Sequence, residues 1–283
     1  MARTSPPKTD GLKVLPPPPT GFDALTATKR TLARHGLPER PDPRTQPGLA
    51  ALWERTARRY RGFEHVAAEL VATDKPPLAT AAAFALAPIE SAGFELFSRA
   101  PITIFSGTWT VPNLTFRSGG VGPNRFRTFF GLGFLDIHVE MTVDSAQNVT
   151  SVIRIHTGAQ LSLPVRPGDA ISAILCLQTN SAGTGTYYLA NETTSRTVNL
   201  TLDTGFPPAV RINAGVSRDL SMGPAPLARF GRVYFDELEA FTTSGTRDLV
   251  DGTATTMTDL NGSTLARPVR LNDTAFKVID TGD

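Results

Sequence analysis

The chain has 283 residues, of which 40% are hydrophobic and 19% charged, and a formal net charge of +2. These values are typical of a globular protein, and the balanced charge argues against a nucleic-acid partner. No run approaches the ~20 apolar residues that a membrane-spanning helix needs, and a single cysteine excludes an internal disulfide.

Residues 1–22 are expected to form a proline-rich tail. They contain six prolines, four of them consecutive, and proline lacks a backbone donor and has a fixed φ. The tail is therefore predicted to be extended and solvated, with docking to a protein partner as the alternative. It holds no apolar core of the kind found in a secretory signal, which favours a cytoplasmic location over secretion.

A helical extension is expected over residues 23–97, with helices at 23–36 and 46–72. The apolar residues of the second segment, among them Leu49, Trp53 and Leu70, mostly recur every three or four positions. Its arginines fall mainly on the other side. We interpret them as the solvated face of a helix that packs on the main domain, the alternative being a basic helix for an anionic partner.

The remainder, residues 98–283, is predicted to be all-β. Short β-branched runs alternate with Gly, Asn, Asp and Pro turns, which is typical of a β-sandwich or barrel. The runs include "PITIFSGTWTVP", "RFRTFFGLGF", "LDIHVEMTV", "VTSVIRIHT", "AISAILCLQT", "GTYYLANE", "SRTVNLTLD", "AVRINAGVS" and "FGRVYFDELEAF".

Four of these segments resemble the glutamic peptidases known as eqolisins. "FSGTWTVPN", "VRPGDAISAIL", "LANETTSRTVNLTL" and "PLARFGRVYF" occur in the order and rough spacing of that family. The resemblance implies a concanavalin-like antiparallel β-sandwich of the jelly-roll type, preceded by the helical extension. Trp109, in the first segment, is assigned to the binding residues.

Eqolisins cut peptides with a glutamine–glutamate dyad on the concave face of the sandwich, and the resemblance implies that this dyad is lost here. The position of the glutamine falls on Asp136, and the two acids of the cleft fall on Asn213 and Ser217. Val152 and Arg154 occupy two further cleft positions. Because a serine cannot accept a proton from water at a useful pH, we expect that the chain is not a glutamic peptidase.

The residues around the former glutamine position form a polar face. "LDIHVEMTV" and "VTSVIRIHT" are joined by "DSAQN", a plausible hairpin loop. If Val143 pairs with Val149, side chains two apart share a face. That face would then hold Asp136, His138, Glu140, Arg154 and His156.

Three interpretations of this face compete. It is an inert polar surface, a groove for a peptide, glycan or small molecule, or a new active site centred on Asp136, His138, Glu140 and His156. A metal held by His138, His156 and Asp136 is the least favoured version, and no cofactor is expected. The leading prediction is a non-proteolytic protein that binds a ligand there, contacting Arg154, Asn213, Ser217 and Trp109. An enzyme with new chemistry and an acid peptidase with a displaced dyad are the alternatives.

Overall fold

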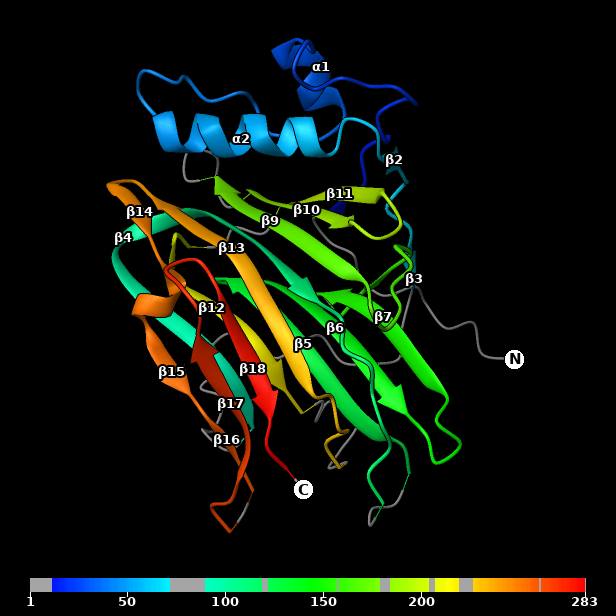
Figure 1. Ribbon diagram of the computed structural model, residues 1–283. Helices are drawn as coiled ribbons and strands as arrows, with labels where there is room; N and C mark the ends of the chain where they lie inside the picture. Colours follow the sequence, from blue (N-terminus) through cyan, green and yellow to red (C-terminus); the bar gives the residue numbers. More distant parts are fainter. Residues whose placement is uncertain are drawn as a thin grey trace.

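The computed structural model (Figure 1) describes residues 12–71, 90–118, 122–156, 158–178, 184–203, 207–218, 226–259 and 261–282. Residues 1–11 of the expected tail, and 72–89 of the expected extension, lie outside this described part. The fold is mostly β, as predicted.

The described part of the extension contains two short helices. α1 (Lys29–Arg34) is capped by the side chain of Thr28, and α2 (Pro47–Arg59) begins with a proline in its first turn. α2 therefore ends well before residue 72, and the expectation of a longer helix was wrong. No helix in the described ranges is long and apolar enough to cross a membrane.

The chain after α2 runs along the sheet instead of continuing as a helix. β2 (Glu64–His65) pairs in parallel with β11 (Arg196–Asp203), and β3 (Leu70–Val71) pairs with β8 (Gln160–Leu161). The Glu64 amide donates to the carbonyl of Ser195. The sheet edge thus satisfies backbone groups that a longer helix would have bonded internally.

β4 (Ser91–Thr110) is a twenty-residue strand that belongs to two layers. The sandwich starts at Ser91 and not at residue 98, so the predicted boundary lay too late. The first half of β4 pairs with β12 (Ala209–Ser217) and β15 (Thr253–Thr255), and the second half with β9 (Ala170–Gln178) and β13 (Arg232–Thr242).

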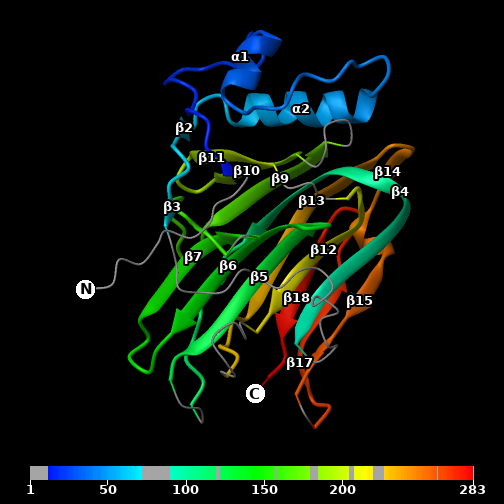
Figure 2. The ribbon, with the colours of Figure 1, turned by 180° about the vertical axis from the view of Figure 1, so that it is seen from behind.

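The other strands extend each layer on either side of β4, as the view from behind also shows (Figure 2). The first layer continues from β12 to β5 (Asn124–Leu132), β6 (Leu135–Val143) and β7 (Val149–Ile155). The second layer continues from β9 to β10 (Thr184–Asn191) and β11, and from β13 to β18 (Phe276–Asp280) and β17 (Thr264–Arg270). The short elements β1 (Leu12–Lys13), β14 (Gly245–Arg247), η1 (Leu249–Asp251) and β16 (Met257–Thr258) complete the described fold. The predicted antiparallel β-sandwich is confirmed.

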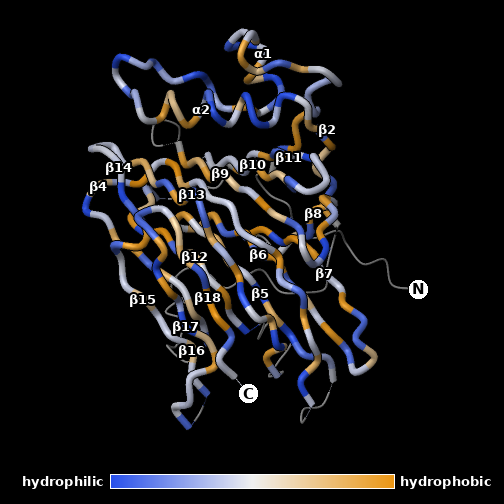
Figure 3. Tube along the Cα trace, viewed as in Figure 1, coloured by the Kyte–Doolittle hydropathy of each residue, from blue (hydrophilic) through white to orange (hydrophobic). Residues whose placement is uncertain are grey.

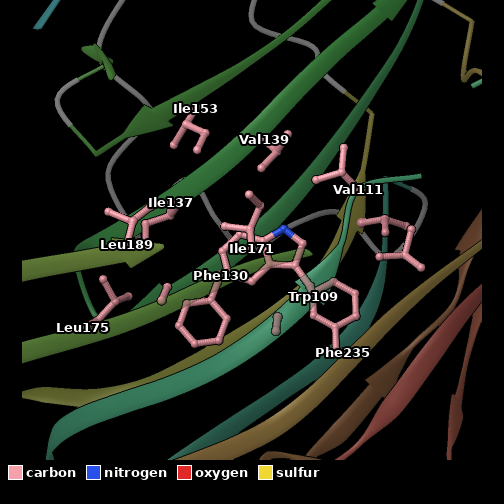
Figure 4. Close-up of a cluster of buried hydrophobic side chains, with 14 of the residues drawn as sticks. Trp109, Val111, Phe130, Ile137, Val139, Ile153, Ile171, Leu175, Leu189 and Phe235 are labelled. Atoms are coloured by element: carbon pink, nitrogen blue, oxygen red, sulfur yellow. The ribbon is translucent and has the colours of Figure 1, made fainter. Parts of the chain in front are cut away.

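The core lies between the two layers (Figure 4). Trp109 and Phe130 stack with their ring centroids 5.4 Å apart, and Phe105 stacks on the same Phe130 at 4.1 Å. Along the trace, hydrophobic and hydrophilic residues alternate in many strands (Figure 3). Trp109 is 1% exposed inside this core, so its assignment to a ligand-binding role was wrong.

α2 lies on the outer side of the second layer and is held there by ion pairs. Arg59 binds Glu237 through two contacts of 2.5 and 2.7 Å, and Arg55 contacts Glu239 at 2.8 Å. The Tyr60 hydroxyl donates to Glu192 at 3.0 Å. The helix therefore packs on the main domain as expected, and these two arginines reach carboxylates of the sheet while the side chains of Arg55 and Arg59 stay 45% and 35% exposed.

We predict that replacing Gly215 with alanine destabilises the fold. A Cβ atom at Gly215 would lie 2.3 Å from the carbonyl oxygen of Ala92 and 2.8 Å from the Cα of Gly93, its partner on β4. Overpacking of this kind costs about 1–3 kcal/mol. Urea unfolding should show a lower midpoint for Gly215→Ala. Gly62→Ala is the matched control, because nothing lies within 4 Å of a Cβ there. Equal midpoints for the two variants would contradict the close approach of β4 and β12.

Candidate functional site

The hairpin of β6 and β7 has the predicted register. Val143 pairs with Val149, Glu140 with Val152 and His138 with Arg154, and the amide of His156 donates to the carbonyl of Asp136 at 3.0 Å. Alternate residues such as Ile137 and Ile153 are fully buried in the core. The polar side chains therefore point to the opposite side of the first layer. We call this side the polar face; its residues here are Arg127, Asp136, His138, Glu140, Arg154, His156, Asn213 and Ser217.

One end of the polar face is closed and internally paired. Arg154 Nε lies 2.7 Å from Glu140 Oε2, and Arg154 Nη1 donates to the carbonyl of Gly158 at 2.8 Å. Arg127 Nε donates to Ser217 Oγ at 3.0 Å, across the β5–β12 pair. All four side chains belong to residues less than one-tenth exposed. This end therefore works as a structural polar layer, and Arg154 and Ser217 do not reach an open groove.

His138 sits in the middle of the polar face. It is 1% exposed, between Phe129 on β5 and Arg154 on β7. Burial first, and the positive charge of Arg127 and the nearby His156 after it, hold the pKa of His138 well below its ordinary value. The imidazole is therefore neutral near neutral pH. Its position in the layer gives it no direct access to a ligand.

The other end of the polar face is more open. Asp136 Oδ2 lies 3.8 Å from His156 Nδ1, and the side chains are 10% and 14% exposed. Asn213 is the next polar group across β5, at 9%. Exposure then rises to 30% for the side chain of Glu95 and 67% for Phe97.

Several residues of this open end were not found from the sequence. Glu95 on β4 forms an ion pair with Arg211 on β12, and the Arg211 guanidinium lies 5.9 Å from the centre of the Phe97 ring. Gly131 separates Asp136 from Asn213. The alternation along β5 and β12 could have placed Arg127 and Arg211 on the polar face. The pairing of β4 with β12 could not have been inferred, because the two segments lie far apart in the chain.

The proposed metal set does not form. Within the described ranges no three His, Cys, Asp or Glu side chains are placed to hold a metal ion. His138, His156 and Asp136 therefore share a face without converging as ligands, and the metal hypothesis is not supported by the geometry.

Comparisons with known proteins agree with the fold. The model of the peptidase A4 family matches residues 90–279, more than half of the chain. A search of curated protein sequences finds no significant match.

Two solved structures are similar to the chain. Scytalido-glutamic peptidase, bound to a peptide-based transition-state analog, has a TM-score of 0.54 and 13% identity, and covers 68% of this chain and 98% of its own. SCP-B, a member of the eqolisin family in complex with the tripeptide Ala-Ile-His, has the same TM-score and coverage with 15% identity. At this identity the likeness shows the fold alone.

We predict that Glu140→Gln strongly destabilises the protein. The substitution leaves the buried guanidinium of Arg154 without its counter-ion, and breaking a buried pair in this way costs about 3–5 kcal/mol. Urea unfolding measures the loss. The control is Glu54→Gln, which breaks an exposed pair with Arg58 on α2 and should cost under ~0.5 kcal/mol. A Glu140→Gln midpoint as high as that of the control would contradict a structural role for the pair.

We also predict that His138 makes the fold acid-sensitive. The unfolded chain takes up a proton on this imidazole near pH ~6.5, whereas the folded chain resists protonation to lower pH. The free energy of unfolding contributed by this group is therefore fully present above that pH and falls below it, by at most ~1.4 kcal/mol per pH unit. Urea unfolding at several pH values between about pH 7 and about pH 5 gives the free energy of unfolding at each pH. This free energy should depend less steeply on pH in His138→Gln than in the parent protein. His35→Gln, in the extension, should keep the parent protein's dependence of unfolding free energy on pH. The same dependence in His138→Gln would refute the role of His138 in acid sensitivity.

Proposed function

The chain belongs to the peptidase A4 family, and we propose that it binds an extended peptide at the open end of its polar face without cleaving it by glutamine–glutamate chemistry. The observation that carries this proposal is the gradient of exposure along the face. The side chains at the Ser217 end are buried and hydrogen-bonded to one another, whereas Phe97 at the other end is exposed.

The loss of the family dyad is supported by the residues on β12. That strand reads "AVRINAGVS" and has no glutamate at any register. Ser217 is fully buried and accepts from Arg127, so it offers neither a base nor access to water. Asn213 carries a carboxamide, which cannot take up a proton in the range where a carboxylate does.

Binding is supported by the aromatic side chain that the first layer leaves uncovered. Phe97 is 67% exposed and shares its face with Arg211 and Asn213. An exposed aromatic ring beside polar groups is the usual composition of an interface anchor. Peptides are favoured over glycans because both similar structures hold peptide-like molecules, which is a property of those proteins and supports the proposal for this chain.

A second candidate is an enzyme with new chemistry. It is favoured by the contact between Asp136 and His156 at the open end, since a carboxylate beside an imidazole can orient a general base. Cleavage of a bound peptide distinguishes the two candidates.

We predict that a dye-labelled synthetic decapeptide of mixed sequence binds the protein and that Phe97→Ala weakens the binding about tenfold. Loss of an aromatic anchor costs over ~1 kcal/mol, and about 1.4 kcal/mol corresponds to tenfold. Fluorescence anisotropy gives the dissociation constant. Tyr234→Ala removes an aromatic ring that is 40% exposed on the second layer and serves as control.

Two results would count against the proposal. Equal affinity of Phe97→Ala and Tyr234→Ala would remove the open end as the binding site. Denatured casein incubated with the protein at acidic pH should stay intact on a gel; cleavage abolished by Asp136→Asn would favour the second candidate.

A further inference from the structure

We infer that Asp136 and Asn213 form a receptor for a protonated primary amine carried by the ligand. The inference rests on the proposed function for the location of the ligand, and adds the chemical group that the site selects. It starts from two side chains on different strands. Asp136 on β6 and Asn213 on β12 both neighbour Gly131, which lies between them on β5.

Gly131 allows these two side chains to converge. A Cβ atom at this position would lie 2.5 Å from Oδ1 of Asp136 and 2.5 Å from Oδ1 of Asn213. The two oxygens are therefore at most twice that distance apart, above a residue with no side chain of its own. Two acceptor oxygens at this separation suit one donor group lying between them.

Both residues are largely buried, and neither side chain has a hydrogen-bond partner among the described residues. Asp136 is 7% exposed and Asn213 is 9% exposed. The nearest basic atom to the Asp136 carboxylate is His156 Nδ1 at 3.8 Å, which is too far for a hydrogen bond. A buried carboxylate in this situation is unfavourable until it acquires a charged donor.

The arginines of the polar face are already engaged elsewhere. Arg154 binds Glu140, Arg127 donates to Ser217, and Arg211 binds Glu95. Of the described residues on the polar face, only His156 lies close to the Asp136 carboxylate, and at 3.8 Å it makes no hydrogen bond that would keep an external cation away.

An ammonium group fits better than the other cations. It is compact and carries three donors, so it can serve a carboxylate and a carboxamide oxygen on different strands at once. A guanidinium prefers both oxygens of one carboxylate in a planar fork. A metal ion would need more ligands, and the described residues contain no group of three His, Cys, Asp or Glu side chains that could hold one. The apolar remainder of the ligand then extends toward Phe97, which is exposed on the same face.

The direct test uses two small probes with the same ring. Isothermal titration near neutral pH should detect binding of 2-phenylethylamine and at least tenfold weaker binding of 2-phenylethanol, which has no charge. Asp136→Asn and Asn213→Ala should each weaken amine binding about tenfold or more, the range expected for hydrogen bonds to a charged group. Glu54→Gln, which removes one exposed carboxylate on α2, should bind like the parent protein. Equal binding of amine and alcohol, absence of amine binding, or full affinity in Asp136→Asn would overturn the inference.

A second measurement tests the premise without any ligand. Asp136→Asn removes a largely buried charge that accepts no hydrogen bond from the described residues, and it keeps the side-chain shape, so the thermal unfolding midpoint should be equal to or higher than that of the parent protein. A clearly lower midpoint would show that the carboxylate already has a stabilising partner inside the chain, and would overturn the inference.

Decapeptides distinguish the source of the amine and separate this inference from the proposed function. Three versions of one sequence are compared: a free amino terminus without lysine, an acetylated terminus with one lysine, and an acetylated terminus without lysine. Tighter binding of the first or the second identifies the terminal or the side-chain amine. Equal binding of all three, still sensitive to Phe97→Ala, would overturn the amine receptor and leave peptide binding intact.

Discussion

The charges of the polar face must be balanced within that face, because the hydrophobic core lies directly beneath it. Arg154 meets this constraint through its ion pair with Glu140, and Arg127 stands opposite the same Glu140 in the β5–β6 pair while it donates to Ser217. His138 meets it by staying neutral. Among the described residues Asp136 has only His156 nearby, at 3.8 Å, and it lies where the face becomes more exposed. The end of the polar face where charged side chains are least closely paired is therefore also the end that a ligand can reach.

The sequence was most informative where pairing is local. The β6–β7 register followed from a short connecting loop and strict alternation, because a shift by one residue would have moved Ile137 and Ile153 out of the core. The end of α2 was missed because Phe63 and Val66 continue its apolar spacing although the backbone there pairs with β11. Trp109 was misplaced because a strand shared by two layers gives no local indication of which side is inward. Gly131 and Phe97 escaped notice because the open end is assembled from β4, β5, β6 and β12, whose pairings span long stretches of chain.

The two layers carry different attachments. The second layer receives α2, which is held by Arg55, Arg59 and Tyr60 over the outer side of β9, β10 and β13. The first layer keeps its outer side for the polar face. β4 connects them, since its first half contributes Glu95 and Phe97 to the open end and its second half pairs with β9 and β13 beneath the helix. The extension therefore stabilises the scaffold from the side opposite the candidate site.

The pairing of β4 also sets the order in which a growing chain can fold. β4 emerges from the ribosome early, yet its partners are β9, β12, β13 and β15, the last of which ends at Thr255. Its backbone groups are all satisfied only after Thr255 has been synthesised, and contacts of such long sequence separation form slowly. During that interval part of β4 remains unpaired, and protection of nascent β4 by a chaperone would be most valuable then.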